Sequence, residues 1–355
     1  MTGDLTDRRL RAGKLPPDLL ASFLGELGTP EKRILLGPGV GEDAAFISFG
    51  STTLIAKSDP ITFATDRIGW YAIQVNANDI AASGGTPKWF LATLLLPENE
   101  PASTAKEIFG QLHRAAQELG ITLIGGHTEV TVGLPRPIIA GTMLGEAAPS
   151  ETVSTSTAAP GDDVILTTGI AIEGTAIIAR ESKSQLTGAG LSETEIEDAA
   201  ALLDSPGISI VSAARTAGAT GHVTAMHDAT EGGLAGALEE LALASNTGIT
   251  VDAARVTVLP ETQKVCDALD LDPWGLIASG ALLITNRPAG TQDIITALSD
   301  NGIPASVIGA VTEYETESGP NQDPHDRLQR IVDGIAGPLP RFDRDEIARL
   351  YGADN

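Results

Sequence analysis

Short apolar runs alternate with amphipathic segments along this 355-residue chain, and this alternation restricts its fold more than any other feature. The run Trp89–Leu96 lies between two prolines and has the length of a buried strand, far too short to cross a membrane. Residues 68–83 instead repeat apolar side chains at helical spacing. Because both kinds of segment recur on either side of residue 150, the sequence predicts an α/β (α+β) fold.

A stretch rich in Ala, Ser, Thr and Pro, residues 148–160, separates two halves and is typical of a linker. At roughly 100–200 residues per domain, the length fits two domains. We therefore expect a helical extension over residues 1–34, domains over 35–148 and 155–340, and a tail over 341–355. The acidic segment 313–326, rich in Gly and Pro, is expected to be a loop.

The charge balance excludes several classes of partner. Forty-seven acidic residues against 23 Lys and Arg give a formal net charge of −24, which repels nucleic acid and anionic lipid.

The single cysteine, Cys266, excludes a disulfide framework within the chain and is expected to be a buried structural thiol. Residues 1–14 carry no apolar segment typical of a signal peptide, so we expect a cytoplasmic, soluble protein.

Several acidic side chains lie beside glycines or at the predicted ends of elements. Asp43 ends a glycine-rich stretch, Lys57-Ser58-Asp59 lies at the end of a predicted strand, and Asp79 lies in the middle of a predicted helix among Ile and Ala. A buried carboxylate needs a partner, and a metal ion is a suitable one. Clustered acids with few bases bind nucleotide phosphates through Mg²⁺ rather than through lysine.

The stretch Gly37-Pro-Gly39-Val-Gly41-Glu-Asp43 matches neither common phosphate-binding motif. No Gly-Lys-Ser/Thr follows, as a P-loop requires, and the stretch opens a predicted strand, whereas a dinucleotide fingerprint opens a helix. Its backbone N–H groups are suited to approach a phosphate while the acids hold Mg²⁺. The alternative is a plain turn between a helix and a strand.

Two further glycine-containing stretches follow predicted strands. In Gly125-Gly126-His127-Thr128-Glu129 the glycines predict a turn that carries polar side chains at a strand end, with a structural histidine as the alternative. In the second stretch a strand runs into Asp228 and a helix starts near Gly232. The amides of a helix N-terminus attract an anion, whereas Asp228 serves as a metal ligand or as a helix cap.

In their order along the chain these motifs resemble the AIR synthase (PurM-like) superfamily over about residues 35–340. Residues Ile172–Glu181 and His227–Leu234 are most similar to its HypE-like branch of hydrogenase expression/formation proteins. The motifs that carry the resemblance are Gly-Glu-Asp-Ala-Ala, Lys-Ser-Asp, Asn-Asp-Ile-Ala-Ala, Gly-Gly-His-Thr-Glu, Ile-Glu-Gly-Thr-Ala and His-Asp-Ala-Thr-Glu-Gly-Gly-Leu.

The resemblance implies a homodimer whose N-terminal strands build a shared barrel, a C-terminal α/β domain, and ATP with Mg²⁺ in a cleft between domains. It implies metal or phosphate ligands at Asp43, Asp59, Asp79 and Asp228. We take Asp79, His127 and Glu129 as candidate catalytic residues. The candidate contacts to the nucleotide are Gly39, Gly41, Lys57, Thr128, Gly174 and Thr230.

The activity implied is ATP- and Mg²⁺-dependent phosphorylation of a carbonyl, carboxyl or phosphate oxygen of a small-molecule or protein-borne acceptor, in hydrogenase or metallocentre maturation. HypE acts on a carbamoyl group carried by a C-terminal cysteine, whereas the printed sequence ends Tyr-Gly-Ala-Asp-Asn. Thiamine-monophosphate kinase, an alternative, usually has Asp where His127 stands. A non-catalytic ATP-binding accessory protein of maturation is the other alternative.

Overall fold

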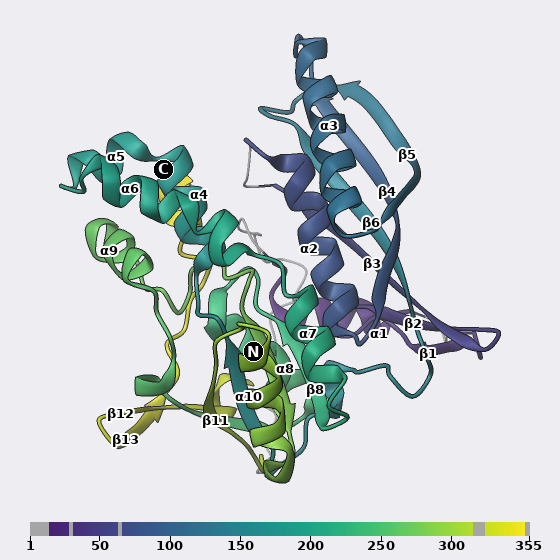
Figure 1. Ribbon diagram of the computed structural model, residues 1–355, viewed down its shortest axis with the longest axis vertical. Coiled ribbons are helices and arrows are strands. Elements are labelled where there is room, and N and C mark those ends of the chain that lie inside the picture. The colour runs from purple at the N-terminus through teal and green to yellow at the C-terminus, as the bar shows by residue number, and fades with distance from the viewer. Residues whose placement is uncertain (1–13, 28–30, 63–65, 315–323, 352–355) are drawn as a thin grey trace, which may run out of the picture. The chain divides into compact units, whose positions relative to one another are not determined.

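The computed structural model describes residues 14–27, 31–62, 66–314 and 324–351 (Figure 1). The chain divides into two compact units. Residues 31–37 and 43–152 form one, which we call the six-stranded unit. Residues 38–42 and 153–355, with those up to residue 30, form the other, the seven-stranded unit. The glycine-rich stretch is therefore divided, because Gly39 and Gly41 belong to the seven-stranded unit and Asp43 to the six-stranded unit.

The six-stranded sheet has the order β1-β2-β3-β6-β4-β5. Neighbouring strands are antiparallel except for β4 and β5, which are parallel. The parallel pair is joined by a helix, as such a crossover requires. The strands are β1 Ile34–Leu36, β2 Ala45–Phe49, β3 Thr52–Ile61, β4 Thr86–Pro97, β5 Thr122–Thr131 and β6 Ile138–Ala147.

Helices α2 (Ile68–Ala82) and α3 (Ala102–Glu118) lie side by side along one face of this sheet (Figure 1). Burial alternates along β6, where Ile139 and Met143 are fully buried and Leu144 and Glu146 are only half-buried. Helix α2 is buried on nearly every side, so a polar residue in it must find its partner inside the protein.

The seven-stranded sheet has the order β13-β12-β9-β11-β7-β10-β8, and only β12 and β9 pair in parallel among its described strands. Its strands are β7 Asp163–Thr167, β8 Val223–Asp228, β9 Gly248–Asp252, β10 Leu282–Asn286, β11 Ala305–Thr312, β12 Leu328–Val332 and β13 Ile335–Pro338. The helices of this unit are α1 Pro17–Gly25, α4 Ile172–Glu181, α5 Lys183–Gly188, α6 Glu193–Ala201, α7 Val211–Gly218, α8 Gly233–Ser245, α9 Pro260–Leu269, α10 Thr291–Asp300 and α11 Ala348–Tyr351.

The core of the seven-stranded unit lies between the sheet and α8. Leu234, Leu238 and Leu241 recur on one face of α8 and are buried with Val164 and Leu283 of the sheet. This packing fixes the N-terminal end of α8, and with it the preceding loop, against the end of β8. In the described residues we find no helix with the length and apolarity needed to cross a membrane.

The predicted fold class is confirmed, but two local predictions are wrong. Lys57-Ser58-Asp59 does not end the strand, because β3 continues to Ile61 through its pairing with β6. Gly125 and Gly126 form no turn, since β5 runs through both. Gly126 passes so near the Ala92 carbonyl of β4 that a Cβ atom would overlap it, so glycine serves close approach of two strands here. Most of the predicted loop over residues 313–326 falls outside the described residues.

Candidate functional site

The six-stranded unit brings three of the predicted carboxylates close together, two of them within 4 Å of one lysine. Asp79 of α2 is 3% exposed, and its Oδ1 accepts a hydrogen bond of 2.7 Å from Lys57 Nζ of β3. The same ammonium lies 3.7 Å from Asp59 Oδ2. Asp43 is also buried and offers a carboxylate oxygen within 4.8 Å of one from Asp79. The structure therefore brings together four residues that the sequence placed on three separate motifs.

Asn76, one turn before Asp79 on α2, forms two hydrogen bonds to the backbone of Asp59. Its Oδ1 accepts from the Asp59 amide at 3.0 Å, and its Nδ2 donates to the Asp59 carbonyl at 3.3 Å. A Cβ atom on Gly141 of the paired strand β6 would lie 2.5 Å from Asn76 Nδ2, so the glycine provides the space for this side chain. The Asn76 side chain thus joins α2, which carries Asp79, to β3, which carries Asp59.

The electrostatics of this cluster favour a divalent cation. The carboxylates of Asp43, Asp59 and Asp79 outnumber the Lys57 ammonium, and two of them are buried. Excess buried negative charge is costly unless a cation balances it. Hard divalent ions such as Mg²⁺ take carboxylate oxygens as ligands, and the separation of Asp43 and Asp79 is short enough for small side-chain shifts to place both on one ion.

The second candidate region is the loop between β8 and α8 in the seven-stranded unit. Asp228, 3% exposed, is the last residue of β8, and α8 begins at Gly233, as predicted. Gly232 and Gly233 have φ of +84° and +64°, which glycine adopts without strain. A Cβ atom on Gly233 would also lie 2.5 Å from the Trp274 carbonyl oxygen. The Gly-Gly pair is therefore required by the turn itself.

A carboxylate from the C-terminal segment lies where the sequence predicted an anion. Asp345 Oδ2 accepts from the Gly232 amide at 2.7 Å, and its Oδ1 accepts from the amides of Ile277 and Ile347 at 3.2 and 2.9 Å. Asp345 is 4% exposed. Asp345 and Gly232 are 113 residues apart, and no local sequence pattern predicts this contact.

Glu173, at the start of α4, is a second acid that sequence reasoning did not select as a site residue. It is 4% exposed, and burial raises its pKa to about 8, with a smaller raising effect from Glu231 and Asp345 and a lowering one from Ser279. Burial likewise raises the pKa of Asp345 to about 6, although three backbone N–H groups lower it. Its place in the Ile172–Glu181 motif was the available signal for Glu173.

Glu240 of α8 links three parts of the seven-stranded unit. Its Oε1 and Oε2 accept from Lys14 Nζ at 2.9 and 3.1 Å, and Oε2 lies 3.1 Å from His227 Nε2. Burial acts to raise the pKa of Glu240, but Lys14 and His227 together lower it to about 2, so this carboxylate is charged at neutral pH. The Lys14 ammonium also donates to Thr230 Oγ1 at 3.2 Å. Sequence reasoning found Thr230 but missed Lys14 and Glu240.

The three candidate glycines have different surroundings. Gly41 has φ of +81°, and a Cβ atom there would overlap the Glu240 carbonyl oxygen, so this position requires glycine. A Cβ atom on Gly39 would meet only the Glu42 side chain, at 3.2 Å. At Gly174, buried in α4, a Cβ atom would lie 2.5 Å from Leu276 Cγ, which gives this glycine a packing role.

His127, Thr128 and Glu129 lie on β5 and are exposed. His127 Nε2 and Glu129 Oε2 are 3.0 Å apart on the same face of the strand, with side chains 65% and 50% exposed. Strand β5 lies three strands from β3, about 14 Å at ordinary strand spacing. Within one chain, the structure does not bring these residues to the Asp79 cluster.

Cys266 of α9 is fully buried, as predicted. Burial, and then the carboxylates of Asp272, Asp267 and Glu346, raise its pKa to about 12. The reactive form of cysteine is the thiolate, which is negligible at neutral pH for such a group. The sequence contains no other cysteine.

Comparison with known proteins matches both parts of the chain to one family. Residues 41–147 match the model of the AIR synthase related protein N-terminal domain, and residues 159–319 match that of its C-terminal domain. The carbamoyl dehydratase HypE of Rhizobium leguminosarum bv. viciae is 27% identical over 319 residues, 85% of this chain and 86% of that protein.

Solved structures show the same fold. The hydrogenase maturation protein HypE in complex with ATP aligns with a TM-score of 0.68 and 20% identity, over 92% of this chain and 91% of that one. AaThiL complexed with AMPPCP and TMP aligns with a TM-score of 0.66 and 21% identity, over 90% and 92% of the two chains. The chain therefore belongs to the AIR synthase-related family and has its two-domain PurM-like fold.

Proposed function

We propose that this protein is an ATP- and Mg²⁺-dependent enzyme of the HypE-like branch that phosphorylates a carbonyl, carboxyl or phosphate oxygen of an acceptor. The observation that carries the proposal is the buried Asp43–Asp79 pair in the six-stranded unit, with Asp59 and Lys57 beside it. The names of the relatives support it, since one is a carbamoyl dehydratase and another was solved with ATP.

In this proposal Asp43, Asp59 and Asp79 are metal ligands of the six-stranded unit, and Asp228 is a metal ligand of the seven-stranded unit. When bound, Mg²⁺ supplies neutralisation of phosphate charge, which is most of what phosphoryl transfer asks of an enzyme. Asn76 holds the Asp59 backbone against α2, the helix that carries Asp79, which reduces the reorganisation that metal binding requires. The acceptor oxygen forms its bond to the γ-phosphorus as the bond to ADP breaks, and we propose that Lys57 contacts a phosphate oxygen.

We do not expect the thiol of Cys266 to carry the acceptor group. Cys266 is buried and protonated, so it is unsuited to carry a carbamoyl group. We therefore propose that the acceptor is a small molecule or is borne by a partner protein, in the setting of hydrogenase maturation that the relatives' names indicate.

The test is calorimetric titration of ATP with Mg²⁺ into the Asp79→Asn variant. We expect Mg²⁺-dependent binding to be lost while the circular dichroism spectrum and unfolding midpoint show a folded protein, because the substitution removes the central carboxylate charge. Glu118→Gln, on the exposed side of α3 in the same unit, is the matched control and should bind like the wild type. Wild-type affinity in Asp79→Asn would overturn the proposal.

Turnover separates the two alternatives. An enzyme of the HypE-like branch should release ADP faster when its acceptor is present. A thiamine-monophosphate kinase should release ADP from ATP when thiamine monophosphate is the sole acceptor. An accessory protein should bind ATP and show no stimulation by any acceptor.

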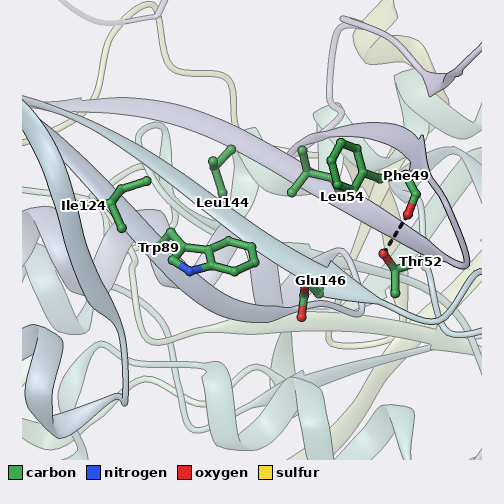
Figure 2. A pocket seen from close by; sticks show the side chains of 7 residues that line it. All are labelled: Phe49, Thr52, Leu54, Trp89, Ile124, Leu144 and Glu146. Carbon is green, nitrogen blue, oxygen red and sulfur yellow. Dashed lines mark hydrogen bonds between the residues drawn. The ribbon is translucent and has the colours of Figure 1, made fainter.

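We further propose that a second copy of the chain covers the open face of the six-stranded sheet, as the family resemblance implies. This face carries an apolar pocket, which Leu54, Trp89, Ile124 and Leu144 line together with Phe49, Thr52 and Glu146 (Figure 2). Ile124 and Val130 of β5 are 49% and 62% exposed, an unusual exposure for apolar strand residues. Light scattering should give the mass of a dimer, and Trp89→Asp that of a monomer; a wild-type monomer at micromolar concentration would contradict this assembly.

A further inference from the structure

The loop between β8 and α8 is surrounded by acidic groups, although the sequence predicts an anion there. Asp228 and Glu231 belong to it, and the Asp345 carboxylate accepts from the Gly232 amide. Glu240 and Glu173 lie on the adjoining helices. A phosphate approaching Thr230 therefore meets mainly negative charge, and a nearby cation is needed for it to bind.

Lys14 supplies positive charge at this loop. It comes from the segment before α1, 216 residues from Thr230, and donates to Thr230 Oγ1 at 3.2 Å. Glu240 fixes the ammonium through both carboxylate oxygens, at 2.9 and 3.1 Å. Lys14, Thr230 and Glu240 all belong to the seven-stranded unit, so this arrangement lies within one compact body.

The Lys14 side chain is held by Glu240 and remains accessible to solvent. Its side chain is 43% exposed, whereas that of Glu240 is 19% exposed. A lysine ammonium has three N–H donors, so a phosphate oxygen that replaces Thr230 Oγ1 as acceptor leaves the contact to Glu240 in place, and the Thr230 hydroxyl is then able to donate to the same phosphate. A charged partner that holds a lysine in one position also reduces the side-chain entropy that a ligand has to remove.

We propose that Lys14 is a phosphate-binding residue that acts with the Thr230 hydroxyl, and that Glu240 is the residue that positions it. The ligand group is a phosphate of the nucleotide, so the inference rests on the proposed function. The N-terminal segment then contributes a binding group to a loop that follows it by more than two hundred residues.

The experiment compares wild type, Lys14→Met and Lys14→Arg by calorimetric titration with ATP and Mg²⁺. We expect Lys14→Met to weaken binding about 10- to 100-fold, the range for a lost charge-assisted hydrogen bond, and Lys14→Arg to retain most of the affinity. Lys264→Met is the matched control, because Lys264 pairs with Glu195 at the same 2.9 Å with a side chain 54% exposed. It should bind like the wild type.

Adenosine distinguishes a phosphate contact from a structural effect. Lys14→Met should lose affinity for ATP and keep the wild-type affinity for adenosine, which carries no phosphate. Equal losses for both ligands, or wild-type ATP affinity in Lys14→Met, would overturn the inference. If the wild-type protein binds no ATP, the proposed function itself fails, and that result is distinct from either outcome.

Discussion

Asp79 of the six-stranded unit and the pair Asp345 and Glu173 of the seven-stranded unit show two different surroundings for a buried acid. In the six-stranded unit Asp79 contacts the ammonium of Lys57 at 2.7 Å. In the seven-stranded unit Asp345 accepts from three backbone amides, and Glu173 lies beside Ser279, while burial raises the pKa of both acids. The number of buried acidic residues therefore does not give the number of metal ligands.

The largest effect on stability is expected at Glu173. Its folded pKa of about 8 lies above the ordinary value of 4.5, so the native state keeps a proton that the unfolded state loses between these pH values. The free energy of unfolding should therefore fall as pH rises from 5 to 8, by on the order of 4 kcal/mol. Glu173→Gln should remove most of this fall, as measured by urea denaturation at several pH values.

The control for Glu173 is the exposed Glu197 of α6. Glu197→Gln should keep the wild-type pH dependence. An equally steep loss of stability in Glu173→Gln would show that burial of this acid is not the cause, and the contrast between the units would lose its main support.

Lys57→Met tests the other side of the comparison. Removing the ammonium leaves the Asp79 carboxylate buried next to Asp43, so we expect the free energy of unfolding to fall by about 3 kcal/mol. Chemical denaturation followed by the fluorescence of Trp70 and Trp89, both in the six-stranded unit, measures this change.

Two further variants sharpen that result. Adding Asp79→Asn to Lys57→Met should recover a large part of the loss, because the uncompensated charge is then gone. Lys106→Met, on the exposed side of α3, should change stability by less than about 0.5 kcal/mol. A loss as small as this control in Lys57→Met would mean that the pair does not stabilise the unit.

The smallest effect is expected at Cys266, a buried group that belongs to neither arrangement of acids. Cys266→Ser should leave the rate of ATP turnover within about twofold of the wild type, because the thiol is buried and its pKa of about 12 keeps it protonated. A steady-state assay of ADP release measures this rate. Collapse of the rate in a folded variant would restore thiol chemistry to the mechanism.

Much of the fold could be predicted from the sequence, because helices and strands depend on the local periodicity of apolar residues. The helical spacing of residues 68–83 predicted α2 within one residue at its end, and the apolar run around Phe90 predicted β4. Asp79 was expected to be half-buried, and the structure buries it more deeply, whereas Asp228 ends a strand as expected. The order of the motifs along the chain also indicated the family that the comparisons confirm.

The sequence by itself determined the succession of elements, the family and the acidic residues that the proposal uses. Tertiary structure decided which groups meet: Lys57 with Asp79, Asp345 with Gly232, and Lys14 with Thr230. It also decided that β5 runs through Gly125 and Gly126, because only the position of β4 shows why glycine is required there. The physical reason is that periodicity is set by neighbours along the chain, whereas a contact across 216 residues depends on how the elements between them pack.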